Sequence, residues 1–140
     1  MTRTVSEKMG IKEKMRAFFV NAPAGVLETM ELPELHVAAT LSGTFNYLHL
    51  FVITQEDFIR QFPRLKKHLA IGGMLWVSWP KNKQLGTDLT LIKVIELGYD
   101  YGLVESTSLK IDETWSALKF THPKEGKLYN NSYGKLKTEN

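Results

Sequence analysis

The sequence predicts a three-layer α/β domain with a mainly parallel sheet and an antiparallel pair of strands at its C-terminal edge. Stretches with strand-like apolar patterns alternate with stretches whose apolar residues recur at helical spacing. This alternation is typical of a parallel sheet that carries helices on both faces. The last two strand-like stretches are joined only by "KIDE", and so short a connection favours an antiparallel pair.

The expected elements follow each other in the order β-α-β-β-α-β-α-β-β. The strands are predicted at residues 15–20, 35–41, 45–53, 74–79, 101–109 and 114–120. The third and fourth of these are strongly apolar, which suits central parallel strands that are buried on both sides. Helices are predicted at residues 24–31, after Thr54, and after a cap at Thr87 or Asp88.

Proline and glycine positions refine this outline. Pro63 lies within the helix that follows Thr54, so we expect a kink or two short helices there. Gly72-Gly73 is interpreted as the turn from that helix into the fourth strand, and Gly98 as the C-terminal cap of the last helix. The apolar face of that last helix is expected to contain Leu89, Ile92 and Ile95.

Composition restricts the classes of function. The chain of 140 residues suffices for one domain, placed at 1–125, and residues 126–140 have no periodicity and are predicted to be a flexible basic tail. The net charge of +3 comes mostly from residues 121–140, with four lysines against two acids, so a nucleic-acid partner is not expected. There is no cysteine, no membrane-length apolar stretch and no signal-peptide pattern, and we expect a cytoplasmic protein.

A ligand is expected where the parallel strands end. In open α/β sheets, ligands bind beyond the carboxyl ends of the strands. The candidate ligand-binding residues at that edge are Asn21, Pro23, Thr54, Trp79, Lys81, Asp88 and Asp112. Lys81 facing a carboxylate there can bind an anion or poise a proton transfer. The alternative is structural: Asp88 caps a helix, Lys81 is solvated, and Asp112 shapes a turn.

The aromatic and histidine residues have competing interpretations. Trp79 either stacks on a planar ligand or closes the core over its strand end. Trp76 lies three residues earlier, so its side chain is expected on the opposite face, in the core. His36 and His49 are interpreted as structural residues of strands. The four histidines show no metal-binding spacing, and the sequence contains neither a G-x-S-x-G elbow nor a phosphate-binding P-loop.

Several segments resemble class I S-adenosylmethionine-dependent methyltransferases. "MGIKEKMRAFFVNAPAG" is similar to the entry of that fold, "FNYLHLFV" to its central fourth strand, and "LAIGGMLWVSW" to the next helix end and strand. The resemblance covers roughly residues 9–121. It implies a Rossmann-like, methyltransferase-like sheet, shortened here by about one βα unit, and S-adenosylmethionine as the cofactor.

Two sites depart from the methyltransferase pattern. The family's loop after the first strand reads like D-x-G-x-G, whereas Asn21, Ala22, Pro23 and Ala24 leave Gly25 as the one glycine here. A proline and added Cβ atoms crowd a backbone that should lie against a ligand. The second strand ends in "ATLSG", without an acidic residue for ribose hydroxyls. From these residues we expect no cofactor in the usual pose.

A second resemblance is to a bacterial family of uncharacterised proteins, domain-of-unknown-function family 3052. It rests on "VNAPAG", "SWPK", "TDLT" and "DETWSALKF" in that order. Together the resemblances imply a methyltransferase-like domain with an altered cofactor loop, which we interpret as a non-catalytic module that binds a small molecule or a protein. The alternative is a methyltransferase that binds S-adenosylmethionine atypically. No catalytic residue, metal ligand or oligomeric state is predicted.

Overall fold

The computed structural model describes residues 3–124, 130–131 and 134–135, and its centre is a six-stranded sheet. The strand order is β2-β1-β3-β4-β6-β5. The strands are β1 (Arg16–Val20), β2 (His36–Val37), β3 (Phe45–Phe51), β4 (Leu69–Pro80), β5 (Val104–Lys110) and β6 (Trp115–Thr121). The pairings among β1, β2, β3 and β4 are all parallel, and β6 runs antiparallel to both β4 and β5. The predicted fold class is confirmed.

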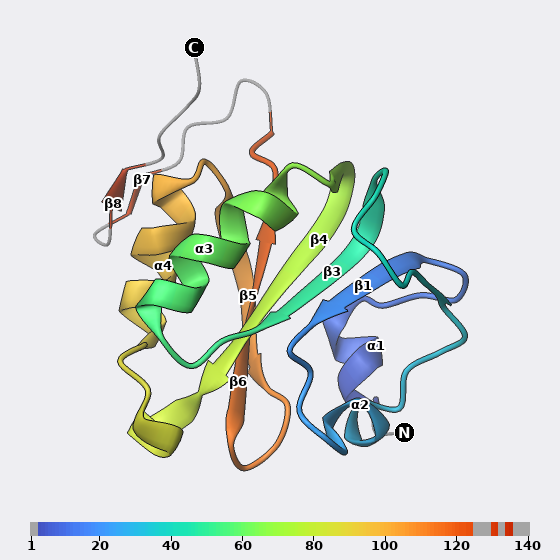
Figure 1. Ribbon diagram of the computed structural model, residues 1–140, viewed down its shortest axis with the longest axis horizontal. Helices are drawn as coiled ribbons and strands as arrows, with labels where there is room; N and C mark the ends of the chain where they lie inside the picture. Colours follow the sequence, from blue (N-terminus) through green and yellow to red (C-terminus); the bar gives the residue numbers. More distant parts are fainter. Residues whose placement is uncertain (1–2, 125–129, 132–133, 136–140) are drawn as a thin grey trace.

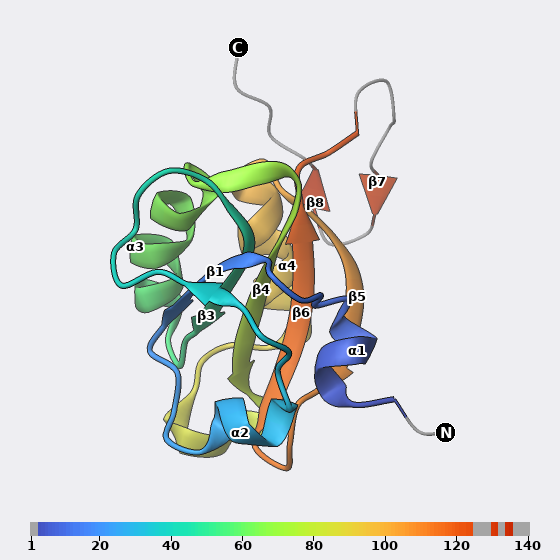
Figure 2. The same cartoon turned by 90° about the vertical axis from the view of Figure 1, so that its right-hand side faces the viewer.

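Helices cover both faces of this sheet. They are α1 (Val5–Met9), α2 (Val26–Met30), α3 (Gln55–Lys66) and α4 (Leu91–Asp100), with a 3-10 segment η1 (Lys81–Gly86) directly after β4. Figures 1 and 2 show α3 and α4 on one face of the sheet, and α1 and α2 at the other. The sheet therefore separates two hydrophobic clusters.

The alternation of side chains along β3 and β4 explains why both faces are buried. Leu48 and Leu50 belong to the cluster under α3 and α4, whereas Tyr47 and Phe51 belong to the cluster under α1 and α2. On β4, Trp76 lies in the second of these clusters and is fully buried. Trp79 lies in the first. The predictions of a buried central pair of strands and of a core position for Trp76 are confirmed.

The second strand is shorter than predicted. Only His36 and Val37 pair with β1, and both are exposed, so the expected strand at 35–41 is wrong in length. Exposed residues gain little from extending a sheet edge. Gly43 lies just before β3, at the edge of the sheet where the parallel strands begin. A Cβ on Gly43 would come within 3.2 Å of the Arg16 guanidinium.

The Gly72-Gly73 pair is not a turn, because β4 runs straight through it. Gly72 has φ +82°, and a Cβ on Gly73 would lie 3.0 Å from the carbonyl oxygens of both Ala70 and Phe45. The register with β3 shifts between Phe45 and Tyr47 at this place. The glycines therefore allow a bulge with close backbone contact. In the sequence, a pair of glycines used in this way looks the same as a pair in a turn.

Two boundary predictions for α4 are also wrong. Its N-cap is Thr90, whose Oγ1 accepts from the Lys93 N–H at 3.2 Å, and not Thr87 or Asp88. Gly98 lies inside the helix, where a Cβ would come within 2.0 Å of the Phe120 ring. Of the residues expected on its apolar face, Leu89 is buried but precedes the helix, Ile95 is buried within it, and Ile92 is 49% exposed.

The segment with Pro63 forms one continuous helix, so the expectation of two short helices does not hold. Pro63 has no N–H to donate to the carbonyl of Ile59, and Ile59 is 46% exposed, so the proline lies against the surface side of the helix. The β5–β6 hairpin forms as predicted. No helix among the described residues is long and apolar enough to cross a membrane.

The predicted flexible tail at 126–140 lies outside the described residues except for two short strands, β7 (Asn130–Asn131) and β8 (Gly134–Lys135). They pair antiparallel, and β8 lies beside α4 (Figure 1).

Candidate functional site

The carboxyl ends of β1, β3 and β4 meet at one edge of the sheet because these strands are parallel. The turn of the β5–β6 hairpin reaches the same edge. The Lys81 N–H donates to the Thr114 carbonyl at 2.8 Å, and Gln84 Nε2 donates to the Glu113 carbonyl at 3.0 Å. The expectation that the hairpin turn joins this edge is therefore confirmed.

Two neighbouring hollows open where β4 ends. The larger, about 330 Å³, has polar walls from Lys81, Asn82, Lys83, Thr90 and Ser116, and apolar walls from Trp79, Leu89 and Leu91. The smaller, about 210 Å³, is lined by Trp79, Leu91, Ser108, Leu109, Lys110, Ser116 and Ala117. Trp79, Leu91 and Ser116 belong to both, so Trp79 is a shared wall.

Trp79 combines both roles considered for it. Its side chain is only 4% exposed and belongs to the hydrophobic cluster under α3 and α4, so it closes the core at the strand end. No hydrogen bond joins its Nε1–H to any described residue. Because every buried side-chain nitrogen and oxygen in the described part of the chain has a partner, this N–H reaches the surface. Trp79 thus combines a core position with an accessible N–H in a residue that lines both hollows.

The lysines give these hollows a positive character. Lys81 and Lys83 line the larger hollow and Lys110 the smaller, while neither lining contains a carboxylate. Lys110 Nζ forms an ion pair with Glu113 Oε1 at 2.9 Å on the exposed hairpin turn. The hydrogen bond to Glu113 raises the pKa of Lys110, and the same bond to Lys110 lowers the pKa of Glu113.

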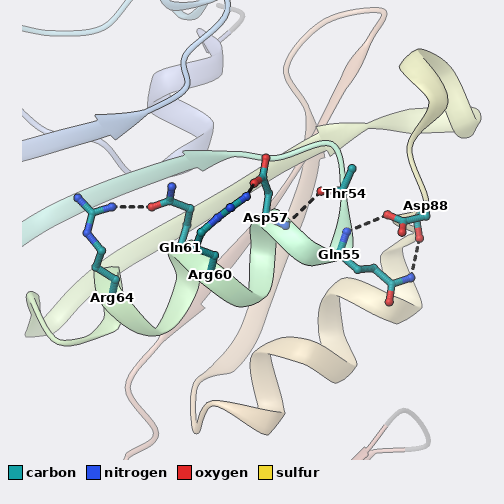
Figure 3. A network of polar contacts seen from close by, with 7 residues as sticks. All are labelled: Thr54, Gln55, Asp57, Arg60, Gln61, Arg64 and Asp88. Atoms are coloured by element: carbon teal, nitrogen blue, oxygen red, sulfur yellow. Dashed lines mark hydrogen bonds and ion pairs between the residues drawn. The ribbon is translucent and has the colours of Figure 1, made fainter.

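Asp88 joins the start of α3 to the loop before α4 and does not line either hollow. Its Oδ1 accepts from the Gln55 N–H at 2.8 Å, and its carbonyl accepts from Gln55 Nε2 at 2.9 Å (Figure 3). Thr54 caps the same helix start, with Oγ1 accepting from the Asp57 N–H at 3.1 Å. Thr54 and Asp88 therefore hold the start of α3 against the loop that leads to α4.

Asp112 acts in the hairpin turn. Its Oδ1 accepts from the backbone N–H groups of Thr114 and Trp115, both at 2.8 Å. This is the turn-shaping role given as the structural alternative. The Lys81 N–H donates to the Thr114 carbonyl, and Asp112 accepts from the N–H of the same Thr114–Trp115 peptide group. Asp112 therefore also orients the carbonyl that binds the Lys81 backbone.

Asn21 and Pro23 lie after β1 and are not in the lining of either hollow. Asn21 has φ +59°, and Gly25, with φ +82°, is the N-cap residue of the short α2. A Cβ on Gly25 would meet nothing within 4 Å, so this glycine serves the backbone conformation and not a close contact. The predicted residues thus form three groups along one edge of the sheet. Asn21 and Pro23 follow β1, Thr54 and Asp88 lie at the start of α3, and Trp79, Lys81 and Asp112 lie around the end of β4.

The structure contains a buried polar cluster of which the sequence analysis considered only His49. Tyr47, His49 and Ser78 form a hydrogen-bonded chain, with 2.6 Å between the Tyr47 hydroxyl and His49 Nδ1 and 2.7 Å between His49 Nε2 and Ser78 Oγ. His49 is fully buried and stacks on Phe51 at 4.2 Å, and burial lowers its pKa to about 3. Burial also raises the pKa of Tyr47. The spacing of Tyr47 and His49 places both on one strand face, but the sequence gives no signal for Ser78.

The polar residues that sequence reasoning missed at the larger hollow are Lys83, Thr90 and Ser116. Thr90 and Ser116 come from α4 and β6, which reach the end of β4 only through the tertiary fold. Within the described residues, no group of three His, Asp or Glu side chains is placed to hold a metal ion.

The solved structures that this fold resembles include methyltransferases. One is a ribosomal protein L11 methylase from Lactobacillus delbrueckii subsp. bulgaricus, with TM-score 0.57, 11% identity, and coverage of 84% of this chain and 74% of that one. Another is the magnesium protoporphyrin IX methyltransferase of Synechocystis PCC 6803 with bound S-adenosylhomocysteine (TM-score 0.54, 12% identity, 84% and 78% covered). A third is the Burkholderia thailandensis 1,6-didemethyltoxoflavin-N1-methyltransferase, also with S-adenosylhomocysteine (TM-score 0.61, 9% identity, 86% and 75% covered).

These similarities show a Rossmann-like, methyltransferase-like fold, in a chain of 140 residues. At such low identity they concern the fold alone. No protein-family model matches the sequence, and no curated protein matches it. Membership of the bacterial family named above therefore stays a prediction.

Proposed function

We propose that this chain is a binding module on a methyltransferase-like fold, and that a small anionic or planar molecule binds at the carboxyl end of β4. The observation that carries this is the pair of hollows sharing Trp79. Ligand sites typically combine apolar walls with a few placed polar groups, and Trp79, Leu89 and Leu91 stand here beside Lys81 and Ser116.

The neighbouring contacts support a pre-formed site. The hairpin turn held by Asp112 supports the backbone at Lys81, and Asp88 fixes the start of the loop that ends at Thr90. Of the predicted site residues, Trp79 and Lys81 then contact the ligand, while Asp88 and Asp112 position the loops. Rigid walls of this kind reduce the ordering cost of binding.

A ligand screen with matched variants tests this proposal. Native mass spectrometry of the purified protein and a thermal-shift screen of small molecules first identify a binder. Trp79→Phe keeps an apolar side chain in the core but removes the N–H, Lys81→Ala removes the ammonium, and Lys67→Ala on the exposed end of α3 is the control. We expect the first two variants to weaken binding at least tenfold and the control to leave it unchanged. If Trp79→Phe and Lys81→Ala bound the ligand as tightly as the natural chain and the control do, the ligand would bind elsewhere.

A second candidate is S-adenosylmethionine-dependent methyl transfer. It is favoured by structures of similar fold that contain S-adenosylhomocysteine. Because of them, the expectation that no cofactor binds has no support, and S-adenosylmethionine belongs among the ligands to be tested.

The described residues do not fit this cofactor in the pose that nucleotides take at a first βα turn. Such a turn uses glycines for close backbone approach and an acidic residue after the second strand for the ribose. Here Pro23 removes a donor, Gly25 is used for its left-handed backbone, and Ala38, Ala39 and Thr40 follow the short β2. Calorimetry with S-adenosylmethionine and S-adenosylhomocysteine decides the matter. Absence of heat and of any thermal shift at millimolar ligand would exclude this candidate.

A further inference from the structure

We propose that the larger hollow binds the phosphate of an organic phosphate monoester, and that the apolar body of this ligand lies against Trp79 in the smaller hollow. This inference rests on the proposed function, because it assigns a chemical class to the ligand of the same site. It is carried by the hydrogen-bond donors gathered around the end of β4, by their charge and by the shape of the two hollows.

The first donors come from the start of α4, a helix of ten residues. Thr90 Oγ1 accepts from the Lys93 N–H, and the Thr90 carbonyl accepts from the Val94 N–H. The N–H groups of Leu91 and Ile92 have no partner within the described part of the chain. Thr90 and Leu91 both line the larger hollow, so the positive end of the helix dipole lies at its wall.

A second, independent donor is the Trp79 indole. The side chain is 4% exposed, and its Nε1–H has no partner among the described residues although it lines both hollows. Because this N–H reaches the surface, an acceptor from outside the protein, water or a ligand, can complete it. An acceptor-rich group in the hollow satisfies this N–H and the free N–H groups of the helix start together.

Two lysines supply the charge. Lys81 and Lys83 line the larger hollow, whereas Lys110 of the smaller hollow is paired with Glu113. Lys83 and its neighbour Asn82 have φ values of +60° and +54°, and Leu85 has +55°. These left-handed backbone positions set the path of η1 directly after β4. Both lysines of the larger hollow therefore come from the η1 segment.

The donor set fits a phosphate better than a carboxylate. Lys81, Lys83 and the helix start carry about 2.5 positive charges, since Glu113, which also acts on Lys81, is offset by its ion pair with Lys110. This charge matches a phosphate monoester of about −1.5 to −2. A phosphate also has three acceptor oxygens for the indole N–H, the helix N–H groups and the ammonium groups. The smaller hollow has apolar walls from Leu91, Leu109 and Ala117, so the esterified group is expected to be an apolar ring.

The test uses four probes on the full chain: inorganic phosphate, phenyl phosphate, benzoate and phenol. The indole N–H signal of Trp79, assigned by its loss in Trp79→Phe, reports binding by NMR, and calorimetry gives Kd. We expect phenyl phosphate to shift this signal and to bind at least tenfold more tightly than inorganic phosphate or benzoate. Lys81→Gln and Lys83→Gln should each weaken its binding at least tenfold, because each removes a charged hydrogen bond to the phosphate. Lys67→Gln, the matched control, should leave it unchanged.

The outcomes separate this inference from the proposed function. Binding of phenol or benzoate at Trp79 as tightly as phenyl phosphate would overturn the phosphate assignment and leave the binding module intact. The phosphate assignment would also be overturned if both lysine variants bound phenyl phosphate as tightly as the natural chain. If no probe shifts the Trp79 signal, the phosphate assignment is wrong, and the thermal-shift screen of the preceding section then decides the binding module by itself.

Discussion

The buried chain of Tyr47, His49 and Ser78 predicts a specific loss of stability in acid. His49 is fully buried, and burial lowers its pKa from 6.5 to about 3. The native protein therefore keeps the imidazole neutral at pH values where the unfolded chain already binds a proton. The stability that this difference contributes is complete above pH 6.5, and it is lost progressively as the pH falls from 6.5 towards 3.

The size of the loss follows from the pKa difference. Each pH unit within this window costs about 1.4 kcal/mol, so His49 alone removes about 3 kcal/mol between pH 6.5 and pH 4. A neutral imidazole has one N–H and one bare nitrogen, so one of its two hydroxyl partners donates and the other accepts. Protonation places a charge between Phe51 and the rest of a dry core, where no carboxylate is among its hydrogen-bond partners.

The assay compares urea unfolding of the natural chain with the triple variant Tyr47→Phe, His49→Leu, Ser78→Ala between pH 7 and pH 4. Removing all three polar groups together avoids leaving one of them buried without a partner. Carboxylates contribute equally to both proteins, so the difference in slope isolates His49. We expect the free energy of unfolding of the natural chain to fall by about 3 kcal/mol more than that of the variant.

NMR titration of the His49 ring protons supplies a readout that does not depend on the variant. Their chemical shifts should stay constant from pH 7 to pH 4.5 in the folded protein. A midpoint near pH 6.5, or parallel stability curves for the two proteins, would show that the imidazole is not held neutral by burial and would refute the reasoning.

Three further predictions concern packing and turns. Gly98→Ala should lower the free energy of unfolding by about 1–2 kcal/mol, because its Cβ overlaps the Phe120 ring and overpacking outweighs the gain in helix propensity; urea denaturation measures it, and a stabilised variant would contradict the packing. Asp112→Ala should cost about 1–2 kcal/mol, because two backbone N–H groups lose their acceptor, whereas Asp112→Asn should keep most of the stability in the same assay. Asp88→Ala should speed hydrogen exchange at the Gln55 amide while Asp88→Asn preserves its protection, and unchanged exchange in Asp88→Ala would show that this bond does not hold the loop.

The fold was predictable where one local signal had a single structural meaning. The apolar runs of β3 and β4 are buried on both faces, and they fixed the centre of the sheet. Glycine had several meanings. Gly72-Gly73 serves a bulge instead of a turn, and Gly98 serves contact with Phe120 instead of a helix end. These uses depend on atoms from distant segments, which a local pattern does not contain.

The candidate site was predictable through the strand-end rule alone. That rule placed Trp79 and Lys81 at the end of β4, and both line the larger hollow. It also selected Asp88 and Asp112, whose carboxylates are used by neighbouring backbone N–H groups. The contributions of Thr90 and Ser116 arise from the packing of α4 and β6 against β4, and no spacing in the sequence relates them.

The uneven build of the sheet has a consequence for local unfolding. On one side, β2 has two residues and α1 and α2 have five each, whereas β3, β4 and β6 form a continuous, deeply buried ladder. Short elements with exposed hydrogen bonds open at lower free energy than a buried core. The segment from α1 to β2 should therefore exchange its amide protons before the rest, and a ligand at Trp79 should slow exchange in β4, β6 and the start of α4 while leaving that early-opening segment unchanged.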